Sequence, residues 1–97
     1  VFLLGILKDK DIDRMLAILL RPGDQVVTVR PNSERAAGAD LVAAVAAGMG
    51  AVTHAAGDPA AGLSEAIARA HAADALLVAA GSLYLVGGIR AMLTARR

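Results

Sequence analysis

The sequence predicts a three-layer α/β sandwich, in which a mainly parallel sheet of four strands carries helices on both faces. Strand-like apolar runs alternate along the chain with segments whose apolar residues recur at helical spacing. The links between them are only a few residues long, which favours right-handed crossovers between parallel strands. The 97 residues, of which 57% are hydrophobic, suffice for one small domain with a single core.

The first half of the chain contains two predicted strands, each followed by a predicted helix. Residues 2–7 form a continuous apolar run, which is typical of a strand buried on both faces. Residues 25–30 are rich in valine, which favours a second strand. Between them lies a predicted helix whose apolar residues form one stripe, namely Ile12, Met15, Leu16, Leu19 and Leu20. A second helix is predicted over residues 36–47, and the residues of its apolar side are Leu41, Val45 and Met49.

The second half repeats the pattern. Residues 51–54 are a short third strand, and residues 75–80 are a fourth. Asp58 and Pro59 predict the start of the intervening helix, because Asp is a favoured N-cap and Pro is favoured at the first helical position. A last helix follows residues 81 and 82. The predicted buried stripes are Leu63, Ile67 and Ala70 in the third helix, and Leu85, Ile89, Met92 and Leu93 in the last.

Composition argues against several functions. Ten basic and nine acidic residues give a net charge of +1, and aromatic residues make up 2%, so we expect no nucleic-acid partner. No uncharged stretch reaches the roughly 20 apolar residues that span a bilayer, so we expect no membrane partner. The absence of cysteine excludes disulfides and fits a cytoplasmic protein.

Known cofactor and catalytic motifs are also missing. The sequence has neither a Walker loop nor a Gly-x-Gly-x-x-Gly fingerprint after its first strand, and it has no cluster with metal-ligand spacing. A hydrolase is rejected because Ser82 lacks the nucleophile-elbow pattern. We therefore expect no catalytic residue and no metal site in this chain. His54 is interpreted as a residue of a strand end or loop, and His71 as a surface residue near a helix end.

Ligands of open parallel sheets bind beyond the carboxyl ends of the strands, which here are followed by residues 8–11, 31–35, 54–58 and 81–84. Lys10 either aims an ammonium group at a carboxylate or phosphate, or belongs to a solvated loop beside a helix cap. Ser82 either joins backbone N–H groups in an anion site, or only caps the last helix. Arg30 and Arg35 either bind an anion or lie in a surface loop.

Three sequence blocks in these loops resemble one known family. They are Gly-Ile-Leu-Lys-Asp-Lys-Asp-Ile at residues 5–12, Pro-Asn-Ser-Glu-Arg-Ala at residues 31–36, and Gly-Ser-Leu-Tyr-Leu-Val-Gly at residues 81–87. In this order and spacing they resemble the Rossmann-like C-terminal domain of the bifunctional folylpolyglutamate and dihydrofolate synthases, which belong to the Mur ligase group. The resemblance covers essentially the whole chain.

The resemblance implies an ATP-dependent ligase that joins L-glutamate to dihydropteroate or a folate through an acyl phosphate. ATP and Mg²⁺ would be bound mainly by a central ATPase domain absent from this chain. By position, Lys10 and Ser82 resemble the residues that hold the incoming glutamate. No role is implied for Arg35.

The sequence departs from the family at two places: the Asp-Gly-Ala-His-Asn motif that normally precedes the first strand is absent, and Gly87 and Gly88 should loosen the last helix. Residues 1–97 are therefore expected to be a C-terminal domain that is incomplete at its N-terminus and inactive alone. Two alternatives remain: the corresponding domain of a peptidoglycan Mur ligase, and a non-catalytic α/β binding module.

Overall fold

Strands and helices alternate along the described part of the chain. The computed structural model describes residues 1–6, 11–30 and 37–81. The last predicted helix, with Leu85, Ile89, Met92 and Leu93, lies outside these residues. In order, the elements are β1 (Phe2–Gly5), α1 (Ile12–Leu19), β2 (Gln25–Val29), α2 (Ala39–Gly48), β3 (Val52–Gly57), α3 (Pro59–Ala73) and β4 (Val78–Gly81).

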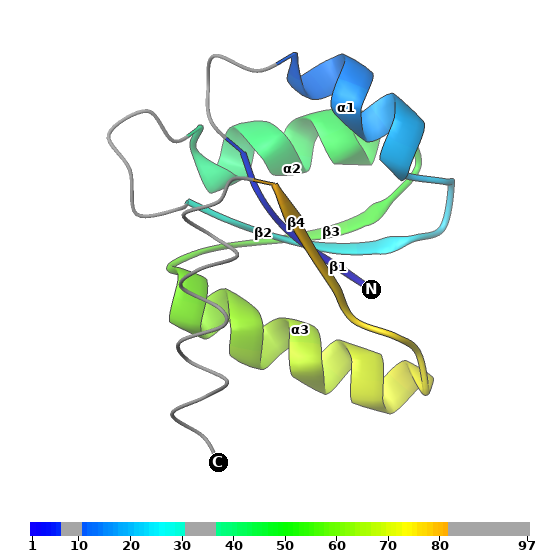
Figure 1. Ribbon diagram of the computed structural model, residues 1–97, viewed down its shortest axis with the longest axis vertical. Coiled ribbons are helices and arrows are strands. Elements are labelled where there is room, and N and C mark those ends of the chain that lie inside the picture. Colours follow the sequence, from blue (N-terminus) through cyan, green and yellow to red (C-terminus); the bar gives the residue numbers. More distant parts are fainter. Residues whose placement is uncertain (7–10, 31–36, 82–97) are drawn as a thin grey trace.

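The four described strands form one sheet in the order β3-β2-β1-β4, and all three pairings are parallel. The chain first moves outward from β1 through β2 to β3. Helix α3 then carries it back across the sheet, so that β4 pairs with the other side of β1 (Figure 1). The predicted parallel α/β class is confirmed, and the structure adds the strand order that the sequence left open.

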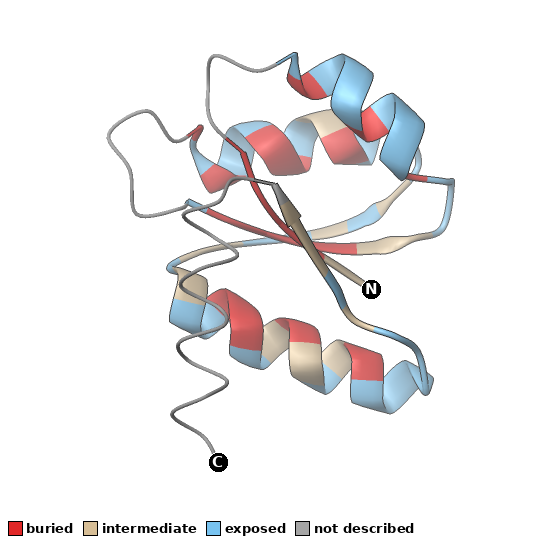
Figure 2. Cartoon of the chain, in the orientation of Figure 1, coloured by how far each residue is buried: buried red, intermediate tan, exposed pale blue. Residues whose placement is uncertain are grey.

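The sheet lies between two helical layers, with α1 and α2 on one face and α3 on the other (Figure 1). Alternate residues of β1 and β2 point to opposite faces, as the period of a strand requires. Leu4 and Val26 pack with α1 and α2, while Leu3 and Val27 pack with α3. Each of the two central strands is therefore apolar on both faces, and the buried helix residues turn towards the sheet (Figure 2).

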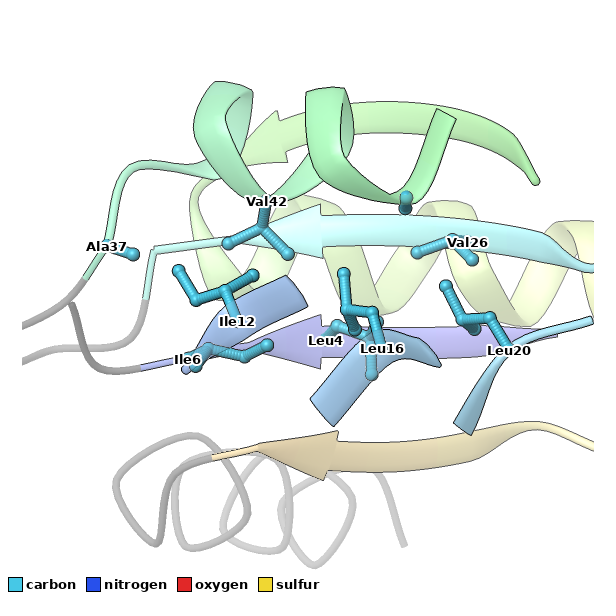
Figure 3. Packing of buried hydrophobic residues seen from close by; sticks show 9 residues of the cluster. Leu4, Ile6, Ile12, Leu16, Leu20, Val26, Ala37 and Val42 are labelled. Carbon is cyan, nitrogen blue, oxygen red and sulfur yellow. The ribbon is translucent and has the colours of Figure 1, made fainter. Parts of the chain in front are cut away.

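The α1 and α2 layer holds the larger apolar cluster (Figure 3). Helix α1 contributes the buried residues Ile12 and Leu16, and Leu20 follows at its C-cap. The predicted stripe of α1 is thus correct at three positions. Its other two members, Met15 and Leu19, are 38% and 37% exposed.

The predicted apolar side of α2 is correct in part. Val45 and Met49 are partly buried and pack against the apolar cluster, but Leu41 is 53% exposed. The buried residues of the helix are Ala39, Val42, Ala43 and Ala46. Helix α2 begins at Ala39, three residues later than predicted. Small alanines lie on both sides of this helix, so the larger apolar residues identified its buried side only in part. Alanine at the contact lets the helix approach the sheet closely.

Strand β3 is longer than predicted, because it continues through Ala55 and Ala56 to Gly57. His54 therefore lies within an edge strand, in register with Val27, and not at a strand end or in a loop. Alanine and glycine have low strand propensity, so the sequence did not predict this extension of β3. Pairing with β2 holds it in the sheet.

Helix α3 has the ends that the sequence predicts. Asp58 is its N-cap, and its Oδ2 accepts a hydrogen bond from the backbone N–H of Ala61 at 3.0 Å. Pro59 occupies the first helical position. Asp74 ends the helix in the left-handed region at φ 50°, and its backbone N–H donates to carbonyls of the last turn. Leu63 and Ala70 are buried as predicted, and Ile67 is partly buried.

Gly62 sets the distance between α3 and β2. A Cβ atom built on Gly62 would overlap the Cγ1 atom of Val29, which is itself fully buried. Since Val has few accessible rotamers and Val29 lies in the sheet, the overlap cannot be relieved by a flexible side chain. Any side chain at residue 62 must push the helix and the sheet apart.

We predict that Gly62→Ala lowers the free energy of unfolding by about 1–2 kcal/mol, because overpacking costs roughly 1–3 kcal/mol and exceeds the gain of about 1 kcal/mol in helix propensity. Chemical denaturation of the purified chain measures the difference. Gly48→Ala is the matched control in α2, where a Cβ would meet no atom within 4 Å. That control should leave stability unchanged or raise it, and equal effects of the two substitutions would contradict the packing argument.

Candidate functional site at the carboxyl edge of the sheet

The strand order creates a switch point between β1 and β4. The chain leaves β1 towards one side of the sheet, whereas β4 lies on the other side of β1. In open α/β sheets, ligands bind beyond the carboxyl ends of the strands at such a point. The last residues of the two strands, Gly5 and Gly81, are register partners. The segments that follow them begin side by side.

A backbone hydrogen bond joins the first sequence block to the residue that directly follows the second block. The N–H of Ala37, which follows residues 31–36, donates to the carbonyl of Ile6 at 2.8 Å. Ile6 and Ala37 are both buried, with exposures of 2% each. Gly81 pairs with Gly5, so the first and third blocks each have a described residue at this part of the edge, while residues 31–36 lie outside the described residues.

Thr28 strengthens the same region from within the core. Its hydroxyl is fully buried and donates to the carbonyl of Ala39 at 2.8 Å. This bond links β2 to the first residue of α2. It therefore fixes the start of the helix that follows residues 31–36, close to the bond between Ala37 and Ile6.

The carboxyl edge also carries two acidic helix caps and one cation. Asp11 accepts from the N–H of Arg14 at 3.2 Å at the start of α1, and Asp58 caps α3. Arg30 follows β2 with an exposed side chain, while its backbone N–H donates to Gly57 at 2.7 Å. Both carboxylates have a structural role as helix caps. Arg30 therefore places an exposed cationic side chain at this edge.

The predicted site residues Lys10 and Ser82 lie outside the described residues, as do Lys8, Arg35 and Tyr84. Their roles remain predictions. What the structure adds is the position of the strand ends from which they follow, since Lys10 is five residues after Gly5 and Ser82 is directly after Gly81. His71 is exposed in the last turn of α3, as predicted. His54 is exposed on the edge strand β3, away from the switch point.

The described residues offer no group of three or more His, Cys, Asp or Glu side chains that could hold a metal ion. Across residues 1–6, 11–30 and 37–81, no helix is long and apolar enough to cross a membrane. On α3, Arg69 Nε and Glu65 Oε1 form an ion pair at 2.7 Å. The hydrogen bond from Arg69 lowers the pKa of Glu65 below its ordinary value, with smaller contributions from the charges of Arg69 and His54. This pair lies along the helix and not at the switch point.

Comparison with known proteins gives consistent matches. A protein-family model described as the C-terminal domain of dihydrofolate synthetase matches residues 1–93. A folylpolyglutamate synthase from Mycobacterium tuberculosis, solved with ADP and AMPPCP, has a TM-score of 0.81 and 28% identity over 94% of this chain. Another structure of that synthase, with ADP, has a TM-score of 0.68 and 23% identity over 95% of this chain, and supports the fold alone.

The present chain corresponds to 22% of the length of each matched synthase chain. No curated protein sequence gives a significant match. The similarity therefore concerns one domain of a larger protein, and it includes all three sequence blocks.

We predict that Thr28→Val lowers the free energy of unfolding by about 1 kcal/mol. The substitution removes a buried hydrogen bond and leaves the carbonyl of Ala39 without this donor. Hydrogen exchange should also accelerate more at the amide of Ala37 than at that of Val27 in the sheet. Thr28→Ser keeps the hydroxyl and should preserve the protection of Ala37. An equal acceleration at both amides would show that Thr28 does not hold this region specifically.

Proposed function

This chain belongs to the family of dihydrofolate synthetase C-terminal domains, and from this we propose that it is the glutamate-binding part of an ATP-dependent ligase. The proposed enzyme joins L-glutamate to dihydropteroate, or to the glutamate tail of a folate. The observation that carries the proposal is the family match, which extends over residues 1–93 and thus over every candidate loop. The M. tuberculosis synthase at 28% identity supports the same class of substrate.

The chemistry belongs to the longer protein. A carboxylate of the acceptor takes the terminal phosphoryl group of ATP, which gives an acyl phosphate and ADP. The amine of glutamate attacks the acyl carbon, phosphate leaves, the nitrogen loses a proton, and an amide remains. Binding of ADP and AMPPCP by the M. tuberculosis synthase supports a nucleotide-dependent reaction.

The residues of this chain do not fit a nucleotide and metal centre of their own. The sequence lacks a Walker loop, and the described residues contain no metal-binding cluster. We therefore assign ATP and Mg²⁺ mainly to a linked central domain of the same polypeptide. In our proposal this chain binds glutamate and completes the site when the domains meet.

The switch point suits this role, because the strand ends that precede Lys10 and Ser82 lie side by side there. The ammonium group of Lys10 would pair with a carboxylate of glutamate, and Ser82 would donate a hydrogen bond from the start of the last predicted helix. Two such donors on adjacent strand ends would orient the glutamate amine towards the acyl phosphate. The register of Gly5 with Gly81 supports this arrangement.

The alternative functions receive less support. A peptidoglycan Mur ligase would share the architecture. However, the matched family and the M. tuberculosis synthase are both named for folate substrates. A non-catalytic binding module is disfavoured because the match is to a domain of a synthetase. Glutamate-dependent ADP release with dihydropteroate or a folate, but not with a UDP-muramyl substrate, tests the proposal in the complete protein.

For that complete enzyme we predict that Lys10→Ala raises KM for glutamate by about 10–100-fold, because a lost hydrogen bond to a charged group costs roughly 1.5–3 kcal/mol. Ser82→Ala, which removes a neutral donor, should raise KM by about 2–10-fold. Steady-state kinetics with varied glutamate measures both effects. His71→Ala is the control, since His71 is exposed on α3 away from the switch point. Unchanged KM in both variants would remove Lys10 and Ser82 from the glutamate site.

We also predict that the 97-residue chain alone forms no ADP from ATP in the presence of glutamate and dihydropteroate. The reason is that it lacks a phosphate-binding loop. A coupled assay for ADP provides the measurement, with the complete enzyme as positive control. Glutamate-dependent turnover by the chain alone would contradict the division of labour proposed here.

A further inference from the structure

Strand β3 is one edge of the sheet in the described part of the chain. Within residues 1–6, 11–30 and 37–81, it pairs with β2 and with no other strand (Figure 3). An edge strand presents backbone N–H and C=O groups that can pair with a strand of another chain. The bonds between β3 and β2 determine which backbone groups of β3 are presented in this way.

The backbone groups of Thr53 and Ala55 point away from β2. The N–H of Val52 donates to the carbonyl of Asp24 at 2.8 Å, so the backbone of Val52 points towards β2. In a parallel pair, every second residue of a strand directs both its N–H and its C=O to the same neighbour. Since the register from Val52 to Ala55 is unbroken, the backbone of His54 also points to β2, and that of Thr53 and Ala55 points outward.

Strand β3 lacks the features by which many edge strands avoid pairing with another chain. Its sequence, Val-Thr-His-Ala-Ala-Gly, contains no proline, no lysine and no acidic residue. The irregularity in its pairing with β2 falls opposite Thr28 and Val29, after Ala55, so the segment from Thr53 to Ala55 is regular. Ala55 is also small and exposed. A second strand can therefore approach the outer edge of this segment.

Two copies of β3 match each other in an antiparallel pair. A twofold axis at His54 places Thr53 of each copy opposite Ala55 of the other. Opposed residues that point towards each other in an antiparallel pair exchange two hydrogen bonds. The two Thr53–Ala55 pairs would therefore use every outward N–H and C=O group of the segment in both copies. The same axis makes the two contact surfaces identical, as a symmetric dimer requires.

The side chains at the contact are compatible with this pairing. His54 is in register with Val27, which packs with α3, so His54 and Val52 lie on the α3 face of the sheet. In the antiparallel pair, Val52 would lie opposite Ala56 of the second copy, and Ala56 packs against the apolar cluster of α3. Val52 is 53% exposed in one copy. The second copy would thus cover an exposed apolar side chain with a small one.

The charged groups near His54 are already paired. The pKa of Glu65 is lowered mainly by its hydrogen bond with Arg69, and to a smaller extent by the charges of Arg69 and His54. The carboxylate of Glu65 therefore lies near His54 while it is bound to Arg69 at 2.7 Å. Strand β2 has no titratable side chain from Gln25 to Val29. A second copy at this edge would bring ion pairs without net charge, which do not repel each other strongly.

We propose that β3 is the contact surface of a symmetric dimer, in which two copies of this chain join their sheets by antiparallel pairing of residues 53–55. A second copy is the occupant because the twofold arrangement pairs all outward backbone groups, covers Val52 and brings no net charge to the contact. The inference does not rest on the proposed function, because none of these residues belongs to the proposed glutamate site.

Single cysteine substitutions test the register, since the chain contains no cysteine of its own. The two copies of residue 54 would form a non-hydrogen-bonded pair with Cα atoms about 4.5 Å apart, within reach of a disulfide. We expect His54→Cys to give a disulfide-linked dimer on mild oxidation at pH 8. Ala55→Cys is the matched control on the same strand and should give severalfold less, because its two copies are offset by roughly 7 Å along the strands.

Sedimentation equilibrium measures the association of the unmodified chain. We expect its mass to rise from one chain towards two with a dissociation constant between about 1 µM and 1 mM. Ala55→Pro removes an outward N–H and places a ring at the contact, but it leaves the bonds of β3 to β2 in place. It should raise the dissociation constant at least about tenfold. Ala55→Ser keeps the N–H and should associate like the unmodified chain.

Each contrary result has a definite meaning. A mass of one chain at all concentrations up to about 1 mM would overturn the proposal. Association that Ala55→Pro leaves unchanged would place the contact on another surface, and equal cross-linking of the two cysteine variants would contradict the register. If Ala55→Pro fails to fold, the cysteine pair still decides. Absence of the His54→Cys cross-link in the longer polypeptide that contains this chain would show that another segment covers β3, and would also refute the dimer.

Discussion

The structure depends on burying β1 between two helical layers and two neighbouring strands. Leu3 and Leu4 are fully buried on opposite faces, and each residue of β1 is paired in register with β2, β4 or both. Because its backbone groups are satisfied within the sheet, the strand can consist of apolar residues without loss of hydrogen bonds. This central position also determines where β1 ends, and hence where the candidate site can form.

The two ends of β1 have different consequences. At the carboxyl end, Gly5 pairs with Gly81, and Ile6 accepts a hydrogen bond from Ala37, the residue that follows the second sequence block. At the amino end, Val1 is bonded to Leu76 and Val78 beside an apolar surface.

Much of the fold was predictable because its signals are local. Continuous valine and leucine runs identified β1 and β2, and the Asp58-Pro59 pair identified the start of α3. The whole buried side of α2 and the length of β3 were not predictable, since alanines form much of both and their partners lie elsewhere in the sequence. Strand order likewise depends on contacts between distant segments. Of the candidate site, the sequence predicted the loops, but the hydrogen bond of Thr28 to Ala39 had no sequence signal.

The close approach of α3 to β2 limits how this domain can vary. Gly62 and Val29 share one space, so an enlarged residue 62 requires a smaller residue 29. The two positions, 33 residues apart, should therefore change together, and Val29→Ala is the compensating partner of Gly62→Ala. Such a pair would keep the helix at its present depth, and with it the path by which α3 returns the chain to β4. Coupled variation at these positions is a mark by which sequences sharing this particular packing can be recognised.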